Sequence, residues 1–335
     1  MIVTLKRGVR PEAVQRELAG RCLWFRRLES EDRVQLYVEP GSARVDAGAL
    51  RVIDGVESVA LEPSSHPRVD AQGSGVDVDG AVVGGGGDPV LMAGPCSVES
   101  ESQIHQVAGR LAEHGVTFLR GGAFKTRTSP YSFQGHGEPA LDWLRDAADA
   151  AGLKVVTELL SPQHAPRLAR TADLIQIGSR NMQSSPLLEA AAAEGKPILL
   201  KRGMAATIEE WLQAGEYCLV HGAPGVVFCE RGIRGFDAST RNLLDLGAVA
   251  LLSRVHGLPV VVDPSHATGR RDLLLPLSVA AVSAGAAGIM VETHPDPGSA
   301  LSDGPQALPL DEFAELAGAI RARRGAWQAT PSMGS

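Results

Sequence analysis

Short apolar runs alternate with amphipathic stretches through most of the chain from residue 90 onward. The runs are rich in Val, Ile and Leu, and each ends in a charged or metal-competent side chain. They end near Cys96, Arg120, Glu158, Arg180, Lys201, Arg231, His266 and Glu292. Eight such runs predict the strands of a (β/α)8 TIM barrel, an α/β fold whose reactive groups collect at the carboxyl ends of its strands.

The segments between these runs repeat apolar residues at three- and four-residue spacing, which is typical of helices that bury one face. We expect helices at 102–114, 138–151, 162–170, 185–194, 207–220, 240–256, 273–284 and 311–323. Strict alternation of strands and helices implies parallel strands, so a doubly wound open sheet is the competing architecture. Polar chemistry after nearly every repeat favours a closed barrel over residues 90–327, followed by a tail at 328–335.

The first 62 residues carry a different pattern. Strands are expected at 2–6, 22–28, 33–39 and 56–62, and helices at 10–20 and 45–53. This βαββαβ order predicts a small ferredoxin-like or ACT-like unit. Few of its polar groups suit catalysis, so we expect a regulatory or structural role for residues 1–62.

Residues 63–89 connect the two parts. Pro, Ser and Gly are frequent in 63–75, which predicts a linker. Asp79-Gly80 lies between alternating apolar residues and predicts a β-hairpin, which could close the bottom of the barrel. The glycine run at 84–87 lacks the Lys-Ser/Thr of a P-loop and precedes a strand, so an ordinary loop is favoured over a phosphate loop.

Charge and composition argue against some classes of function. The formal net charge of the 335 residues is -7, which is unfavourable for a nucleic-acid surface because phosphate backbones attract basic patches. No window approaches the roughly 18 apolar residues that span a bilayer, and the first residues lack the apolar core of a signal peptide. Four cysteines without a CxxC pair indicate a reduced, cytoplasmic setting.

Four residues that are far apart in sequence would meet at one barrel mouth. Cys96, His266 and Glu292 follow the first, seventh and eighth strands, and Asp303 lies in the loop after the eighth. A thiolate, an imidazole and two carboxylates suit a divalent first-row metal such as Mn²⁺, Fe²⁺, Co²⁺ or Zn²⁺. A single buried cysteine or solvated carboxylate is common without a metal, and only the shared location favours the metal reading.

A second group of residues near the strand ends is cationic. It comprises Arg120, Lys125, Arg127, Arg180, Lys201, Arg231 and Arg234. A solvated rim would account for some of them. However, Arg120, Lys201 and Arg231 directly end apolar runs, where an unpaired charge would be costly. We therefore expect a small ligand with several negative charges, from phosphates and a carboxylate.

Seven ordered motifs made of these residues resemble one enzyme family. They are GPCS at 94–97, LRGGAFKTRTSPYSFQG at 119–135, IQIGSRN at 175–181, LLKRG at 199–203, CERGIR at 229–234, VDPSHATGRRD at 262–272 and VETHPDPGSALSDG at 291–304. The family is the type I 3-deoxy-D-arabino-heptulosonate 7-phosphate (DAHP) synthases, in the group related to 3-deoxy-D-manno-octulosonate 8-phosphate (KDO8P) synthase. The resemblance covers residues 90–325, and a small amino-terminal unit occurs in one branch of the family.

The resemblance implies an aldol-type condensation of phosphoenolpyruvate with erythrose 4-phosphate. The reaction releases phosphate and opens the shikimate pathway to the aromatic amino acids. The family pattern assigns the divalent metal, with Mn²⁺ as the first choice, to Cys96, His266, Glu292 and Asp303. The metal would polarise the aldehyde oxygen as a Lewis acid.

The same pattern divides the cations between the two substrates. Arg180, Lys201 and Arg231 would grip the phosphate of phosphoenolpyruvate, and Arg120 with Lys125 its carboxylate. Arg127 and Thr128 would hold the phosphate of erythrose 4-phosphate. The candidates for moving protons or placing the attacking water are Lys125, Lys201, Glu158 and Asp263, which the sequence does not rank.

The segment after Lys125 bears on the choice of aldose. Lys-Thr-Arg-Thr-Ser at 125–129 has the spacing of the heptulosonate enzymes, whereas KDO8P synthases resemble the longer Lys-Ala-Asn-Arg-Ser-Ser. Thr126 replaces the usual proline of the family, so this loop lacks a fixed φ angle. Ser179 and Gly235 also depart from the family, which usually has Ala and Thr there.

The sequence is compatible with two other interpretations. One is a KDO8P synthase, or a specialised relative that uses another aldose phosphate. The other is a catalytically silent barrel that binds phosphorylated ligands, although retention of all four presumed metal ligands argues against it. Analogy with the family further implies a homo-oligomer, a tetramer, and an aromatic amino acid effector that acts through residues 1–62.

Overall fold

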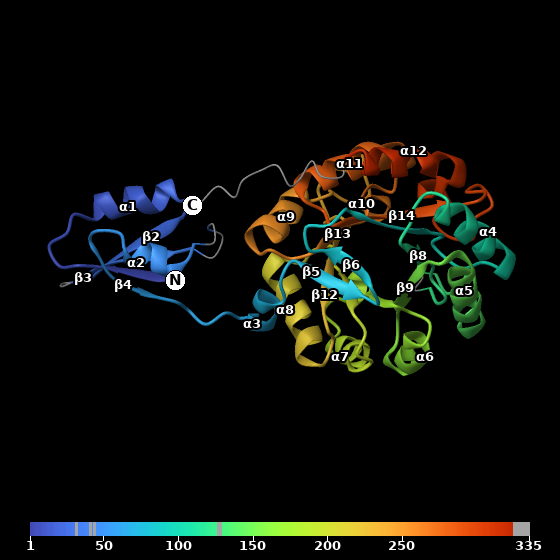
Figure 1. Ribbon diagram of the computed structural model, residues 1–335, viewed down its shortest axis with the longest axis horizontal. Coiled ribbons are helices and arrows are strands. Elements are labelled where there is room, and N and C mark those ends of the chain that lie inside the picture. The colour runs from blue at the N-terminus through green and yellow to red at the C-terminus, as the bar shows by residue number, and fades with distance from the viewer. Residues whose placement is uncertain (31–32, 40–41, 43–44, 126–128, 324–335) are drawn as a thin grey trace. The chain divides into compact units, whose positions relative to one another are not determined.

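The computed structural model describes residues 1–335 except 31–32, 40–41, 43–44, 126–128 and 324–335 (Figure 1). The chain forms two compact units, with the boundary between Ser65 and His66. No helix in the described part of the chain is both long and apolar enough to cross a membrane.

The amino-terminal unit has the expected βαββαβ order. Its elements are β1 (Ile2–Leu5), α1 (Pro11–Gly20), β2 (Phe25–Ser30), β3 (Arg33–Val38), α2 (Ala47–Arg51) and β4 (Val56–Ala60). The antiparallel sheet has the order β2-β3-β1-β4, which is the ferredoxin-like arrangement. Strand β2 begins later than predicted because Cys22 adopts a left-handed conformation (φ 57°) where the chain turns after α1. Val3, Leu18 and Leu36 lie in the core of this unit.

The second unit is built on parallel strands. They are β7 (Val90–Gly94), β8 (Phe118–Arg120), β9 (Lys154–Leu159), β10 (Leu174–Ile177), β11 (Ile198–Lys201), β12 (Val226–Glu230), β13 (Val260–Val262) and β14 (Gly288–His294). In β14, Ile289 lies opposite Val262 of β13 and also opposite Leu91 of β7. The sheet is therefore closed, which confirms the TIM barrel and excludes the open sheet. A short strand, β15 (Leu308–Pro309), pairs with β14.

Helices surround the barrel (Figure 1). The longer ones are α4 (Glu101–Ala112), α5 (Glu138–Ala151), α7 (Ser185–Ala193), α8 (Ile208–Val220), α11 (Leu274–Ala284) and α12 (Leu310–Arg321). The shorter ones are α6 (Ala165–Ala169), α9 (Leu246–Ala250), which runs into a π-helical turn at Leu251–Val255, and α10 (Pro264–Thr268). Single 3-10 turns lie at Pro162–His164, Ser179–Asn181, Arg271–Leu273 and Gly304–Gln306.

One predicted helix is shorter than the sequence pattern indicated. We expected a helix over 240–256, but α9 begins only at Leu246. The side chain of Asp245 caps it by accepting a hydrogen bond from Ala248 N at 2.9 Å. The preceding residues instead form a β-bridge between Ile233 and Leu243, which removes them from the helix.

A hairpin closes one end of the barrel, as expected. It consists of β5 (Gly75–Val78) and β6 (Ala81–Gly84), joined by Asp79 and Gly80, which both have positive φ angles as a two-residue type I′ turn requires. Val76, Val78 and Val83 pack against inward-facing side chains of the barrel. A Cβ atom at Gly225, just before β12, would lie 2.9 Å from Val76. The hairpin therefore covers the amino ends of the strands.

The expected linker over 63–75 is partly ordered structure of the barrel unit. Helix α3 (Pro67–Ala71) lies against α8, where Glu216 accepts hydrogen bonds from the Arg68 and Val69 main-chain N–H groups at 2.9 Å. The Gln72 amide also pairs with both the N–H and the carbonyl of Val226. Composition misled the prediction because a short helix with one buried apolar residue has little periodic signal.

Candidate active site

A cavity of about 620 Å³ opens at the carboxyl ends of the strands. Eight of the predicted site residues line it, namely Arg120, Lys125, Glu158, Arg180, Lys201, Arg231, His266 and Asp303. Arg234 lines it as well, whereas Arg127 and Thr128 lie outside the described residues. The loops after the strands thus bring most of the predicted cations and two of the predicted metal ligands to one place.

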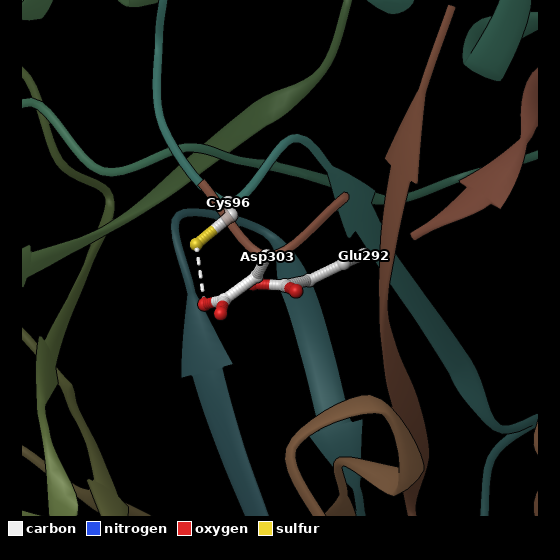
Figure 2. Close-up of side chains that lie close together, drawn as sticks. All are labelled: Cys96, Glu292 and Asp303. Atoms are coloured by element: carbon white, nitrogen blue, oxygen red, sulfur yellow. Dashed lines mark hydrogen bonds between the residues drawn. The ribbon is translucent and has the colours of Figure 1, made fainter. Parts of the chain in front are cut away.

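Three of the four candidate metal ligands, Cys96, Glu292 and Asp303, lie close together beside this cavity (Figure 2). One ligand atom each from Cys96, Glu292 and Asp303 lies within 4.8 Å of the others. The Cys96 thiol donates to Asp303 Oδ2 at 3.1 Å, and His266 Nε2 lies 3.2 Å from Glu292 Oε1. Sulfur, nitrogen and oxygen donors in this arrangement fit a first-row divalent metal.

Burial and charge act in opposite directions on these ligands. Burial, together with the charge of Glu292, raises the pKa of the Cys96 thiol to about 12, against the effect of Lys125. Burial would also raise the pKa of Glu292, but His266, Arg120 and Lys125 hold it at about 2. Metal binding through sulfur must therefore displace the thiol proton, whereas the carboxylate is already ionised.

Asp263 fixes the orientation of the histidine. Its Oδ1 accepts from His266 N at 3.0 Å, and its Oδ2 lies 2.7 Å from His266 Nδ1. Lys201 Nζ also donates to Oδ2, at 2.5 Å. Burial opposes ionisation of Asp263, yet the charges of His266 and Lys201 hold its pKa well below the usual range. With Nδ1 occupied, His266 presents Nε2 to Glu292 and the candidate metal position.

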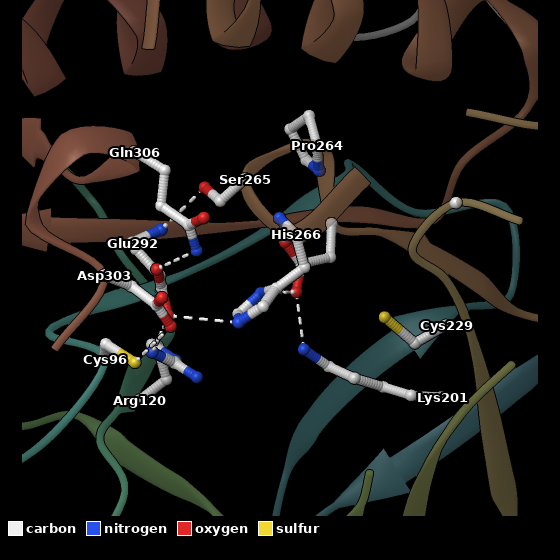
Figure 3. A network of polar contacts seen from close by, with 12 residues as sticks. Cys96, Arg120, Lys201, Cys229, Pro264, Ser265, His266, Glu292, Asp303 and Gln306 are labelled. Atoms are coloured by element: carbon white, nitrogen blue, oxygen red, sulfur yellow. Dashed lines mark hydrogen bonds and ion pairs between the residues drawn. The ribbon is translucent and has the colours of Figure 1, made fainter. Parts of the chain in front are cut away.

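Glu292 is held from several sides (Figure 3). Arg120 Nη1 donates to its Oε1 at 2.9 Å, and Gln306 Nε2 donates to its Oε2 at 2.5 Å. The main-chain N–H of Glu292 donates to Ser265 Oγ at 3.0 Å. No sequence pattern predicted Gln306 or Ser265. Ser265 is adjacent to His266, but an isolated serine or glutamine carries no pattern that distinguishes it from a surface residue.

Two buried arginines have donors without partners. Arg231 is only 8% exposed, and its Nη1 finds no acceptor among the described residues. Burial lowers the pKa of Arg231, and Asp263 counteracts this effect. Arg120 Nε likewise finds no acceptor in the described part of the chain. Because leaving a buried charged donor unsatisfied is costly, these two side chains indicate an anionic ligand in the cavity.

Glu158 lies close to the backbone that follows β10. A Cβ atom at Gly178 would lie 1.9 Å from Glu158 Oε1, so a side chain there would force this carboxylate to move. Gln176, Arg241 and Asn242 also line the cavity, although no motif predicted them. Asn242 donates to the carbonyl of His266 at 3.2 Å, a contact that depends on the loop after β12 and not on local sequence.

The amino-acid sequence of the chain matches a known protein family. The model described as the DAHP synthetase I family matches residues 67–325. A phospho-2-dehydro-3-deoxyheptonate aldolase from Thermotoga maritima is 43% identical over 330 residues, which cover 94% of this chain and 95% of the relative. A 2-dehydro-3-deoxyphosphooctonate aldolase from Nitrobacter hamburgensis is 34% identical over 246 residues, which cover 68% of this chain and 84% of the relative.

Solved structures agree with these matches. The crystal structure of the Thermotoga maritima phospho-2-dehydro-3-deoxyheptonate aldolase (DAHP synthase) has a TM-score of 0.75 and 42% identity, covering 96% of each chain. A truncated form of the Thermotoga maritima synthase has a TM-score of 0.72 and 44% identity, covering 77% of this chain and 96% of its own. The chain therefore is an enzyme and belongs to the DAHP synthetase I family.

Proposed function

We propose that this enzyme is a metal-dependent DAHP synthase. It would condense phosphoenolpyruvate with erythrose 4-phosphate to give 3-deoxy-D-arabino-heptulosonate 7-phosphate and phosphate, the first step of the shikimate pathway. The observation that carries the proposal is the convergence of Cys96, His266, Glu292 and Asp303 beside a cavity with unsatisfied buried arginine donors. The relative that matches nearly the whole chain has the corresponding name.

The cations of the cavity suit the two charged groups of phosphoenolpyruvate. Arg180, Lys201 and Arg231 would bind its phosphate, and the unsatisfied Arg231 Nη1 supplies one donor. Arg120 and Lys125 would bind its carboxylate, through Arg120 Nε and the ammonium group of Lys125. Charge-assisted hydrogen bonds of this kind are about twice as strong as neutral ones.

A divalent metal, Mn²⁺ or else Fe²⁺, Co²⁺ or Zn²⁺, would supply Lewis-acid polarisation of the aldehyde. Around the metal, residues of the chain position the two substrates and donate protons to them. C3 of phosphoenolpyruvate attacks the aldehyde carbon, water adds at C2, and phosphate leaves. Burial opposes charge on Lys125, but Cys96, Glu158 and Glu292 raise its pKa, so it stays protonated and acts as a donor. Glu158 and Lys201 line the cavity and remain the candidates for placing the water.

Asp263 was a candidate for moving protons, but its contacts favour another role. Both of its oxygens are engaged by His266, and Oδ2 is engaged by Lys201 as well. We assign it the orientation of these two groups. It would hold Lys201 Nζ toward the phosphate and His266 Nε2 toward the metal.

Two observations favour erythrose 4-phosphate over arabinose 5-phosphate, the aldose of the KDO8P reading. The segment at 125–129 has the heptulosonate spacing. The heptonate relative also matches both units of this chain, whereas the octonate relative matches 68% of it. We propose that Arg127 and Thr128 bind the aldose phosphate, next to Ser129 and Ser132, which line the cavity.

The amino-terminal unit has a separate proposed role. All of the proposed catalytic residues lie in the barrel unit. We propose that this unit binds an aromatic amino acid and inhibits the enzyme, that the enzyme is a homo-oligomer, and that it works in the cytoplasm. Inhibition requires that the effector bind the active and inactive arrangements with different affinity.

Phosphate release tests the proposed reaction. The chain is stripped with a chelator and mixed with phosphoenolpyruvate and erythrose 4-phosphate, before and after addition of Mn²⁺, Fe²⁺, Co²⁺ or Zn²⁺. We expect phosphate release only after metal addition, and slower release with arabinose 5-phosphate. Full activity in chelator would contradict metal dependence, and binding of phosphoenolpyruvate without turnover under any condition would support the silent-barrel reading.

A further inference from the structure

The loop that carries Asp303 has a constrained backbone. Asp303 has a φ of 51°, a left-handed conformation that few residues other than glycine adopt. The next residue, Gly304, lies so near the start of the loop that a Cβ atom there would be 2.2 Å from the carbonyl oxygen of Pro297. A side chain in this conformation keeps its direction only if the surrounding contacts hold the loop.

Glu99 supplies two of those contacts from the loop that carries Cys96. Its Oε1 accepts a hydrogen bond from Leu301 N at 2.8 Å, two residues before Asp303. Its Oε2 lies 3.3 Å from Nε2 of His294, the last residue of β14. The buried hydroxyls of Ser97 and Ser302 also contact each other across the same two loops. Both ends of the Asp303 loop are therefore tied to the segment that follows Cys96.

The hydrogen bonds around His294 determine which hydrogen-bonding groups residue 99 must provide. The main-chain N–H of Asp296 donates to Nδ1 of His294 at 3.1 Å, so Nδ1 is the acceptor and the ring proton is on Nε2. Nε2–H therefore donates to Glu99. Because Leu301 N is also a donor, residue 99 needs two acceptor oxygens, and a carboxylate provides both.

We propose that Glu99 is a positioning residue that holds Asp303 within reach of Cys96 and thereby sets the affinity of the site for its metal. This inference rests on the metal site of the proposed function. Glu99 is itself no ligand: it acts through the loop. Groups that orient metal ligands typically change metal affinity about 10- to 100-fold when they are removed.

The loop between β8 and α5 contacts the main chain of Glu99. His136, at the end of the loop between β8 and α5, has its Nε2 2.9 Å from the carbonyl oxygen of Glu99. A change of the Glu99 side chain leaves this carbonyl in place. The substrate contacts on the β8–α5 loop should therefore survive such a change, and the effect should fall on the metal.

Glu99→Gln is the sharpest variant because it keeps the shape and replaces one acceptor with an NH₂ group. In either orientation the amide places a donor against His294 Nε2–H or against Leu301 N–H. We expect Co²⁺ and Mn²⁺ to bind about 10- to 100-fold more weakly in competition with a chelating dye. The thiolate-to-cobalt absorption band of Cys96 should persist at saturating Co²⁺, and the KM for phosphoenolpyruvate should be unchanged there. The matched control is Glu101→Gln, an exposed glutamate at the start of α4, which should bind metal as the wild type does.

A double-mutant cycle separates positioning from general stability. In an Asp303→Asn background, which weakens the ligand itself, the added effect of Glu99→Gln on metal affinity should fall below about twofold, because the two residues act as one unit. The same fold-change in both backgrounds would overturn the proposal, as would wild-type affinity in Glu99→Gln. If Glu99→Gln does not fold, His294→Leu removes the same donor–acceptor pair, and unchanged metal affinity there overturns the proposal equally. Failure of the wild type to bind metal would instead refute the proposed function.

Discussion

The two ends of the barrel bury different kinds of side chain, apolar at one end and charged at the other. At the amino ends of the strands, Val76, Val78 and Val83 of the hairpin bury themselves against apolar side chains. At the carboxyl ends, Asp263 and Glu292 are almost fully buried as well, yet both are charged and engaged in ion pairs. Burial at the first end stabilises the fold through removal of apolar surface from water. Burial at the second end costs stability and instead fixes the direction of each charged group.

The largest effect should come from removing the thiol at the mouth. We expect Cys96→Ala to abolish metal binding and turnover while the melting temperature changes little, because only one small side chain is lost. Metal content and phosphate release measure this. Cys229→Ala is the matched control, because Cys229 is a buried cysteine in the barrel interior. This variant should bind metal as the wild type does. Turnover by Cys96→Ala in the presence of chelator would show that the reaction at the barrel mouth does not need the metal.

The next effect concerns the buried acid that orients two partners. Asp263→Asn removes the charge that holds both His266 Nδ1 and Lys201 Nζ. We expect metal affinity to fall about 10- to 100-fold, measured by competition with a chelating dye. Asp173→Asn, which breaks the ion pair with Arg145 elsewhere in the barrel unit, should leave the affinity unchanged. Equal losses in both variants would mean that the effect is general destabilisation.

The aldose contact should give an effect confined to one substrate. Loss of a charge-assisted phosphate contact in Arg127→Ala costs about 1.5–3 kcal/mol, or roughly tenfold to a hundredfold. We expect the apparent KM for erythrose 4-phosphate to rise by this factor and the KM for phosphoenolpyruvate to change far less. Equal changes for the two substrates would contradict the assignment. A preference of the wild type for arabinose 5-phosphate would overturn the heptulosonate reading itself.

At the apolar end the expected effect is on stability alone. Val78→Ala removes two buried methyl groups and should lower the free energy of unfolding by about 2 kcal/mol. Metal affinity and kcat/KM should stay at the wild-type values. Val82→Ala on the same hairpin, where the side chain is 52% exposed, should change neither property. A loss of turnover in Val78→Ala that exceeds its loss of folded protein would show that the two ends are coupled.

The smallest effect on turnover is expected from removing the amino-terminal unit. A chain that starts near Val76 would lose α3, whose main chain is bound by Glu216, so a start at Ser64 is the better choice. This truncation should keep turnover and lose inhibition by tyrosine or phenylalanine, measured as phosphate release with and without each amino acid. Insensitivity of the intact enzyme to all three aromatic amino acids would refute the effector proposal, and a folded but inactive truncation would refute the division of labour.

The fold was largely predictable because each barrel strand is a buried apolar run with a polar end. The same rule predicted that Cys96, His266 and Glu292 lie close together at the mouth, since a polar group at the end of a strand must lie there. It failed for Glu99, whose role depends on two loops that meet only in three dimensions. It also failed for α3, which is held by hydrogen bonds to a distant helix and not by its own periodicity.

The hairpin at the amino ends of the strands has a consequence for how the chain acquires its structure. Residues 75–84 are synthesised before every strand of the barrel, but their valines are covered only when the ring is complete, including β14. An isolated two-stranded hairpin is marginally stable in water. During folding the hairpin should therefore be only partly formed, with its apolar face exposed to water, until β14 completes the barrel. Closure of the ring and burial of the hairpin should then be one cooperative event, and chains that end before β14 should aggregate.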